Sequence, residues 1–255
     1  MAIEKRDVIA GRPLRGVPSL AAPSRPAAPG PRTPPRRSPP VAGPATLPLV
    51  LWPALLTLGV TALRLVGELR GWSPATFSRL PGGGLSPLGI SWLPPLVGAW
   101  FGWKLAKAGA GPAGVGRGLG LTLLALVILP VLGVVASRLK LDPLGRGTLV
   151  IYVVGSVAAL AVGLQAWPAL GRTLLAYAFA ARVPVALLML AAIYGNWGTH
   201  YDVAPPNLPA MGPLLKWFYI GFLPQFTIWI AFTVVVGSLF GIVAGAIARR
   251  GRTAA

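Results

Sequence analysis

The feature that most constrains this chain is a succession of apolar runs, each about as long as a lipid bilayer is thick. A helix needs about 20 mainly apolar residues to cross the roughly 30 Å hydrocarbon core of a bilayer. Such runs follow one another between residues 46 and 248. We therefore predict an all-α, polytopic transmembrane helix bundle with short interfacial helices. The expected spans cover residues 47–67, 87–106, 119–137, 148–166, 172–194 and 224–247.

The second run, residues 87–106, is the least regular, because Pro94 and Pro95 stand near its middle. Two prolines remove two backbone donors and kink or break a helix. The bundle is therefore expected to have six spanning helices, or five if residues 87–106 form a re-entrant segment. The last apolar region, residues 213–247, exceeds one span. Its aromatic start at residues 216–219 predicts a short interfacial helix before the final span.

Two polar segments flank the predicted bundle of residues 46–248. Residues 1–45 combine Pro, Arg, Ala, Ser and Gly without an apolar period, which predicts a disordered cytoplasmic tail. Residues 249–255 form a short basic C-terminal tail. With the N-terminus inside, 15 of the 23 Lys and Arg residues lie on the cytoplasmic side and 6 on the other. This excess predicts that both the N- and the C-terminus are cytoplasmic.

The composition narrows the function classes. The net charge is +18, yet the basic residues flank apolar runs instead of gathering on one face as in nucleic-acid binders. We therefore expect membrane lipids as partners, with anionic headgroups contacted through the basic tails, and no nucleic acid. The chain has no cysteine and one histidine, so we expect neither a metal site nor a cofactor. Arg outnumbers Lys, and Ala, Gly and Pro abound, which favours a bacterial cytoplasmic (inner) membrane.

Small residues at a spacing of four mark one face of two predicted helices. Such stripes let a second helix backbone approach closely in the lipid phase. The stripes consist of Gly237, Gly241 and Gly245 in the last span, and of Gly155, Ala159 and Gly163 in the fourth. They predict either packing within the bundle, or association with a second copy or a membrane protein partner.

Arg182 is the sharpest single candidate, because it falls near the middle of the fifth span. A cation at the centre of a spanning helix costs about 2.5–3.5 kcal/mol. Tyr177, Gln165 and Gln225 are the polar side chains expected near it, and together the four residues form a candidate site for an anion or a lipid phosphate. Two structural alternatives are an Arg bonded to carbonyls freed by Pro184, and an Arg that reaches the headgroups.

The loop after the fifth span carries His200, Tyr201 and Asp202. His200 and Asp202 could form an acid–base pair, and the three residues could make an outer-loop contact. Ordinary polar loop residues would look the same in the sequence. The chain shows no nucleophile motif of a hydrolase, no phosphate-binding loop and no carboxylate in the middle of a span.

Three hypotheses of function follow. The glycine stripes and the lack of catalytic motifs favour a non-enzymatic multi-pass membrane protein, a scaffold or accessory subunit that packs in a membrane complex. The alternative is a permease or lipid-handling protein that uses Arg182 and the kinked helices around a neutral or anionic ligand. A membrane enzyme that uses His200 or Asp202 has the least support.

Overall fold

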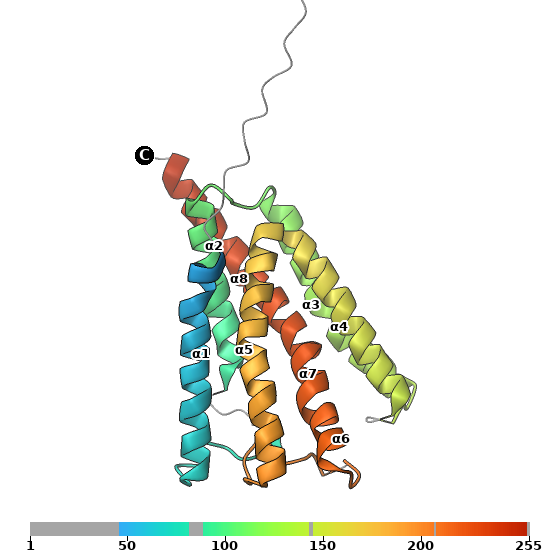
Figure 1. The fold of residues 1–255 in the computed structure, drawn as a ribbon. Helices are drawn as coiled ribbons and strands as arrows, with labels where there is room; N and C mark the ends of the chain where they lie inside the picture. The colour runs from blue at the N-terminus through green and yellow to red at the C-terminus, as the bar shows by residue number, and fades with distance from the viewer. Residues whose placement is uncertain (1–45, 82–88, 143–144, 207, 254–255) are drawn as a thin grey trace, which may run out of the picture. The chain divides into compact units, whose positions relative to one another are not determined.

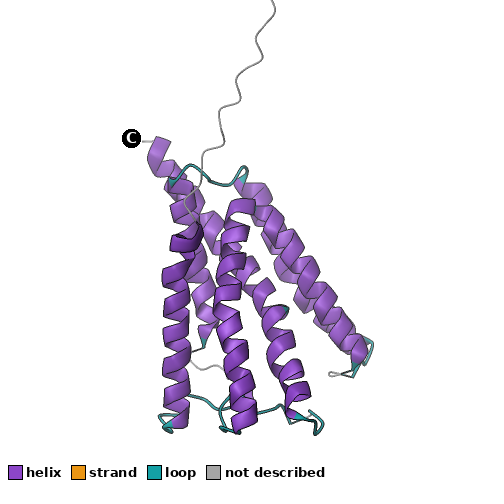
Figure 2. Ribbon diagram, in the orientation of Figure 1, coloured by secondary structure: helices purple, strands orange, loops and turns teal. Residues whose placement is uncertain are grey.

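The computed structural model describes residues 46–81, 89–142, 145–206 and 208–253, and these residues form helices joined by loops (Figures 1 and 2). The predicted tail of residues 1–45 and the last two residues lie outside the described part. The long helices are α1 (Thr46–Leu69), α2 (Leu93–Lys107), α3 (Val115–Arg138), α4 (Arg146–Ala166), α5 (Pro168–Gly195) and α8 (Ile228–Thr253). The short ones are the 3-10 helix η2 (Ile90–Trp92), α6 (Pro213–Trp217), the π-helix η3 (Phe218–Phe222) and α7 (Leu223–Phe226).

The predicted all-α membrane bundle is confirmed. Five described segments are long and apolar enough to cross a membrane: Thr46–Leu69, Val115–Arg138, Arg146–Ala166, Pro168–Gly195 and Pro213–Arg250. Successive long helices run in opposite directions (Figure 1), so α1 begins and α8 ends at the same end of the bundle. We call this the terminal end. The opposite end, which holds residues 70–81 and 196–206, is the loop end.

The second expected span differs from the prediction. Its helix, α2, has 15 residues, and it is therefore about 22 Å long, which is shorter than the hydrocarbon core. Pro94 and Pro95 lie in the first turn of α2. Backbone donors have no intrahelical partner there, so the proline pair starts the helix and does not kink its middle. Helix α2 begins part-way along the bundle, runs opposite to α1 and finishes at the terminal end (Figure 1).

Paired glycines hold α2 against α8. A Cβ atom on Gly98 would overlap the backbone of Gly237, and one on Gly102 would overlap the backbone of Gly241. The two helix backbones therefore touch at two successive turns, and any larger side chain would force them apart. The sequence predicts the stripe on α8, whereas no sequence pattern indicates that Gly98 and Gly102 of α2 are its partners.

Both small-residue stripes are used inside this chain. A Cβ on Gly237, Gly241 or Gly245 would also meet Leu174, Leu170 or Trp167, respectively. Gly155, Ala159 and Gly163 of α4 are all buried, and a Cβ on Gly163 would lie 3.1 Å from Val235 Cγ2 of α8. The close approaches that the stripes permit are thus made between helices of the same chain.

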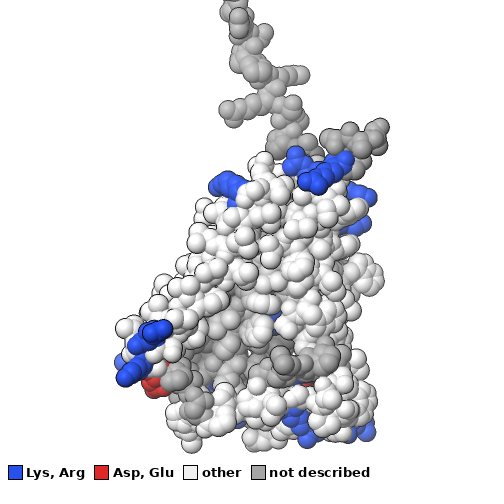
Figure 3. Space-filling view, turned by 180° about the vertical axis from the view of Figure 1, so that it is seen from behind, with Lys and Arg blue, Asp and Glu red and all other residues white. Residues whose placement is uncertain are grey.

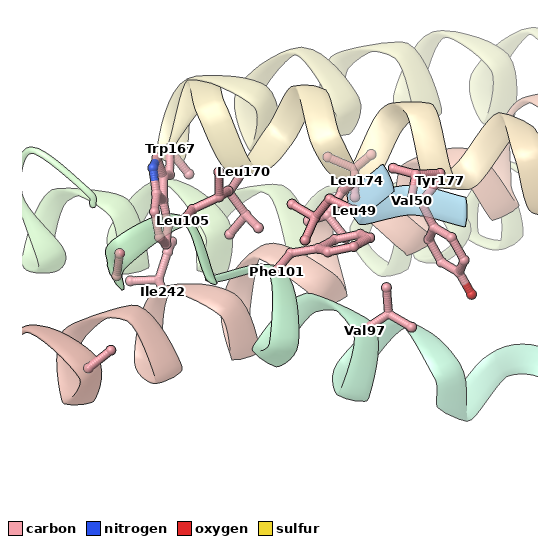
Figure 4. Packing of buried hydrophobic residues seen from close by; sticks show 14 of the residues in the cluster. Leu49, Val50, Val97, Phe101, Leu105, Trp167, Leu170, Leu174, Tyr177 and Ile242 are labelled. Carbon is pink, nitrogen blue, oxygen red and sulfur yellow. The ribbon is translucent and has the colours of Figure 1, made fainter. Parts of the chain in front are cut away.

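The main apolar core fills the space between α1, α2, α5 and α8 (Figure 4). Phe101 and Leu174 are fully buried in it, and Tyr177 lies at one end with its hydroxyl directed away from the other labelled side chains. Trp167 alone joins α4 to α5. Its side chain is buried, and its Nε1 donates a hydrogen bond to the Ala110 carbonyl at 2.9 Å.

The C-terminal region is one helical path, not an interfacial helix followed by a separate span. Helices α6, η3, α7 and α8 succeed one another from residue 213 to residue 253, with Thr227 as the break between α7 and α8. In the π-helix η3 each backbone hydrogen bond spans one residue more than in an α-helix. Gln225 belongs to α7, which follows this irregular segment directly, so the position of Gln225 depends on it.

Candidate functional site

Charged side chains gather at the two ends of the bundle, and a largely uncharged band separates them (Figure 3). The acidic residues Glu68, Asp142 and Asp202 all belong to segments at the loop end, whereas the described part of the terminal end carries none. The basic residues of the terminal end are Lys104, Lys107, Arg117, Arg172, Arg249 and Arg250. Two arginines depart from this distribution because their side chains are buried within the bundle: Arg64 and Arg182.

Arg182 lies at the centre of α5, roughly 20 Å from either end of the helix. Only 3% of its surface is exposed. Its Nη1 donates a long hydrogen bond of 3.4 Å to Gln225 Oε1, and its Nε has no hydrogen-bond partner among the described residues. The guanidinium lies over the ring of Trp229, 4.9 Å from the ring centre. The cation is therefore held by one amide and one aromatic face, and no carboxylate in the described part of the chain forms an ion pair with it.

Gln225 completes a small group of hydrogen-bond donors around this cation. Its Oε1 accepts from Arg182, and its Nε2 points to the Met189 sulfur at 3.7 Å. A thioether is a weak acceptor, so the amide donor is poorly satisfied. Arg182 Nε and Gln225 Nε2 thus offer two donors in the interior of the bundle to any acceptor that enters.

The other two residues of the predicted ligand site have hydrogen-bond partners elsewhere, although Tyr177 still interacts electrostatically with Arg182. The Tyr177 hydroxyl is already paired with Thr57 Oγ1 at 2.8 Å, which ties α5 to α1. Gln165 is exposed near the end of α4 and donates to the Ala161 carbonyl of its own helix at 3.1 Å. Of the four predicted residues, the structure therefore joins Arg182 and Gln225 by a direct hydrogen bond.

A second buried polar cluster lies where α1 meets the loop end. Glu68 is completely buried, and its Oε1 accepts from Arg64 Nε at 2.8 Å and faces His200 Nδ1 at 2.6 Å. Its Oε2 accepts from the backbone N–H of His200 at 2.8 Å. Arg79 donates to the Glu68 carbonyl. The charges of Arg64 and Glu68 therefore face each other inside the protein.

The loop residues beside His200 hold it in place. Asp202 accepts hydrogen bonds from the backbone N–H groups of Gly198 and Thr199 at 2.9 and 2.7 Å, and so closes the turn. The Tyr201 hydroxyl donates to the Thr61 carbonyl of α1 at 3.2 Å. The expected pair of His200 with Asp202 is therefore replaced by His200 with Glu68, while Asp202 shapes the loop.

One sequence signal could have revealed this cluster. The buried polar residues of α1 are Thr57, Thr61, Arg64 and Glu68, which recur at helical spacing on a single face. A polar stripe inside an otherwise apolar span faces protein and not lipid. Its partner at position 200 is 132 residues away in the chain, and no local pattern could supply that contact.

The surroundings of His200 indicate its protonation state and which ring nitrogen carries the proton. Burial lowers the pKa of the imidazole, although the hydrogen bond to Glu68 acts in the opposite direction. The ring is therefore neutral at pH 7, and its Nδ1–H donates to the carboxylate, which leaves Nε2 as an acceptor. Burial also raises the pKa of Tyr201, so its phenol stays protonated. Among the described residues there is no group of three His, Cys, Asp or Glu side chains that could hold a metal ion.

Comparison of the chain with known protein families, with curated proteins and with solved structures returns no match.

Proposed function

We propose that this protein is a permease or lipid-handling protein that binds an anionic ligand inside its helix bundle at Arg182. The observation that carries the proposal is a cation at mid-span that is 3% exposed and that, among the residues the structure describes, has no carboxylate partner and keeps one donor unpaired. A charge in this position is costly, and intramembrane charges that persist are usually paired or line a ligand path. An entering anion would supply the missing partner.

The two structural alternatives for Arg182 lack support in the geometry. The guanidinium bonds to a side-chain amide and an aromatic ring, not to carbonyls freed by Pro184. It does not reach the headgroups either, because it is buried about 20 Å from both helix ends. Neither alternative accounts for the unpaired Nε.

The scaffold hypothesis rested on the glycine stripes and on the lack of catalytic motifs. The stripe of α8 is filled by α2 and α5 of the same chain, so it no longer favours association with a partner. We further propose a bacterial cytoplasmic membrane with both termini in the cytoplasm. The basic terminal end, which has no described acidic residue, supports this orientation.

Native mass spectrometry of the protein, extracted gently from a bacterial membrane without delipidation, tests the proposal. We expect a monomer that carries one tightly held small molecule or lipid. Arg182→Leu should lose this mass, because the only buried cation of the fifth span is gone. Its melting temperature should be unchanged or higher, since removal of an unpaired buried charge relieves a desolvation cost.

Arg172→Leu is the matched control, because Arg172 is an exposed arginine on the same helix. It should retain the bound mass. A wild-type protein without any retained mass contradicts the proposal. A stoichiometric second polypeptide or a discrete homo-oligomer, unaffected by Arg182→Leu, would instead support the scaffold hypothesis.

A further inference from the structure

A row of four phenylalanine rings leads from the loop-end part of the last span toward Arg182. Within the row, Phe218 stacks on Phe222 at 5.8 Å between ring centres, and Phe222 contacts Phe226 at 4.8 Å. Phe226 in turn contacts Phe179 of α5 at 6.2 Å. We call these four residues the phenylalanine row. It crosses from helices η3 and α7 to α5 and is continuous in ring-to-ring contact.

The row ends within one helical turn of the buried cation along α5, because Phe179 precedes Arg182 by three residues on that helix. Phe226 precedes Trp229 by three residues across the break at Thr227, and the Arg182 guanidinium lies over the Trp229 ring. Phe179, Phe218 and Phe222 are exposed, so their rings face the surroundings of the helices and not the core. An aromatic belt that only anchors the helix would stop at headgroup depth, whereas this row continues to the middle of α5.

We infer that the ligand is a single-chain amphiphile, with its phosphate head at Arg182 and its hydrocarbon chain along the phenylalanine row. The inference rests on the proposed function, because it assigns a chemical class to the ligand of the same site. Arg182 Nε and Gln225 Nε2 donate to the head. The hydrocarbon chain of the ligand packs against the four rings. Because lipid tails are equally apolar, this van der Waals packing, and not hydrophobicity, is what favours the protein surface over the surrounding lipid.

The depth of Arg182 favours a phosphate head over a carboxylate. Burial raises the pKa of a carboxylate, so a fatty acid drawn to mid-bilayer depth takes up a proton and loses its attraction to the cation. A phosphate ester keeps at least one negative charge, because its first ionisation is strongly acidic. Its several oxygens can also accept from both donors at once.

Titration of the full-length protein in neutral detergent, followed by native mass spectrometry, tests this assignment with dodecyl phosphate, dodecanoate and inorganic phosphate as probes. Dodecyl phosphate should bind wild-type protein most tightly, and Arg182→Leu should abolish the binding. Phe222→Leu should weaken it about two- to tenfold, since it removes one aromatic contact from the chain. Wild-type and Phe222→Leu protein are titrated in the same micelles, so partition of the probe into detergent cancels from the ratio of their affinities.

Phe240→Leu is the matched control, because Phe240 is 46% exposed on α8, compared with 37% for Phe222, and does not belong to the row. It should leave the affinity unchanged. If Phe222→Leu has no effect while Arg182→Leu still abolishes binding, the chain assignment is wrong and the anion site remains. If dodecanoate binds as tightly as dodecyl phosphate, the phosphate assignment is wrong. Equal binding to wild-type and Arg182→Leu protein would overturn this inference and the proposed function together.

Discussion

His200 shows how one side chain can join two distant parts of this chain. Its backbone N–H and its ring both reach Glu68 of α1, which is otherwise bonded to Arg64. Three donors on one buried carboxylate satisfy it well, and a buried charge is tolerated only under that condition. The loop of residues 196–206 is thereby fixed to α1, although neither segment shows in its own sequence that it binds the other.

At this scale the structure predicts the pH dependence of stability. The pKa of His200 is below its usual value of 6.5, with burial as the main cause, while Glu68, Asp202 and Arg64 are the charges that face it. The unfolded chain therefore binds the proton before the folded protein does. The stabilising contribution is complete above about pH 6.5 and decreases as the pH falls below that value.

Melting temperatures measured between pH 5 and pH 8 check this prediction. The wild-type value should fall toward pH 5, and His200→Asn should remove part of that slope, because an amide can replace Nδ1 as donor but does not titrate. The chain has a single histidine, so the difference between the two curves reports this residue. A wild-type melting temperature that rises on acidification would contradict the assignment of a neutral ring.

At the scale of elements, apolar length predicted the helices well, because a helix must be long enough for the bilayer whatever it packs against. The breaks were harder to predict. In the sequence, Pro94 and Pro95 are equally compatible with a kink inside a helix and with the start of a helix. The structure, in which α2 packs on α8, shows that they start the helix. Trp167 joins two helices without a loop, since its indole is bonded inside the bundle. The Arg182–Gln225 contact could be predicted from the sequence, because the predicted spans contain few polar side chains that could pair with Arg182.

The glycine contacts between α2 and α8 predict a large local effect of added volume. Gly241→Leu should lower the melting temperature strongly, since the side chain would meet Leu170 and the backbone of Gly98. Overpacking of this kind costs typically about 1–3 kcal/mol, and here backbone atoms leave less room to adjust. The oligomeric state should not change, because the stripe is used within one chain.

Gly59→Leu is the control for this prediction, because a Cβ at Gly59 of α1 meets nothing within 4 Å. Its melting temperature should stay near the wild-type value, as a helix former replaces glycine on an open face. A Gly241→Leu protein that melts like wild type but dissociates from a larger complex would contradict intramolecular packing.

At the scale of the whole molecule, the six long helices alternate in direction, so the segments around Ser73 and Ala113 lie at opposite ends of the bundle (Figure 1). Helix α2 lies between them. If the protein sits in the membrane as proposed, these two segments face different compartments even though α2 is shorter than a full span.

Cysteine labelling tests this arrangement cleanly, because the natural chain has no cysteine. In intact cells a membrane-impermeant thiol reagent should modify Ser73→Cys and Ala210→Cys, and Ala113→Cys only after lysis. These positions are exposed, so burial does not limit the reaction. Labelling of Ser73→Cys and Ala113→Cys from the same side would show that the region of α2 does not cross the membrane.

The π-helix η3 has a consequence for how this protein tolerates changes in chain length. Within a regular helix, insertion or loss of one residue rotates everything beyond it by about 100°. In α8 such a change would turn the glycines away from α2. In residues 218–222 the backbone already accommodates one residue too many for an α-helix, so loss of one residue can convert the segment to regular geometry. Loss of one residue should therefore be absorbed in η3 and be disruptive in α8.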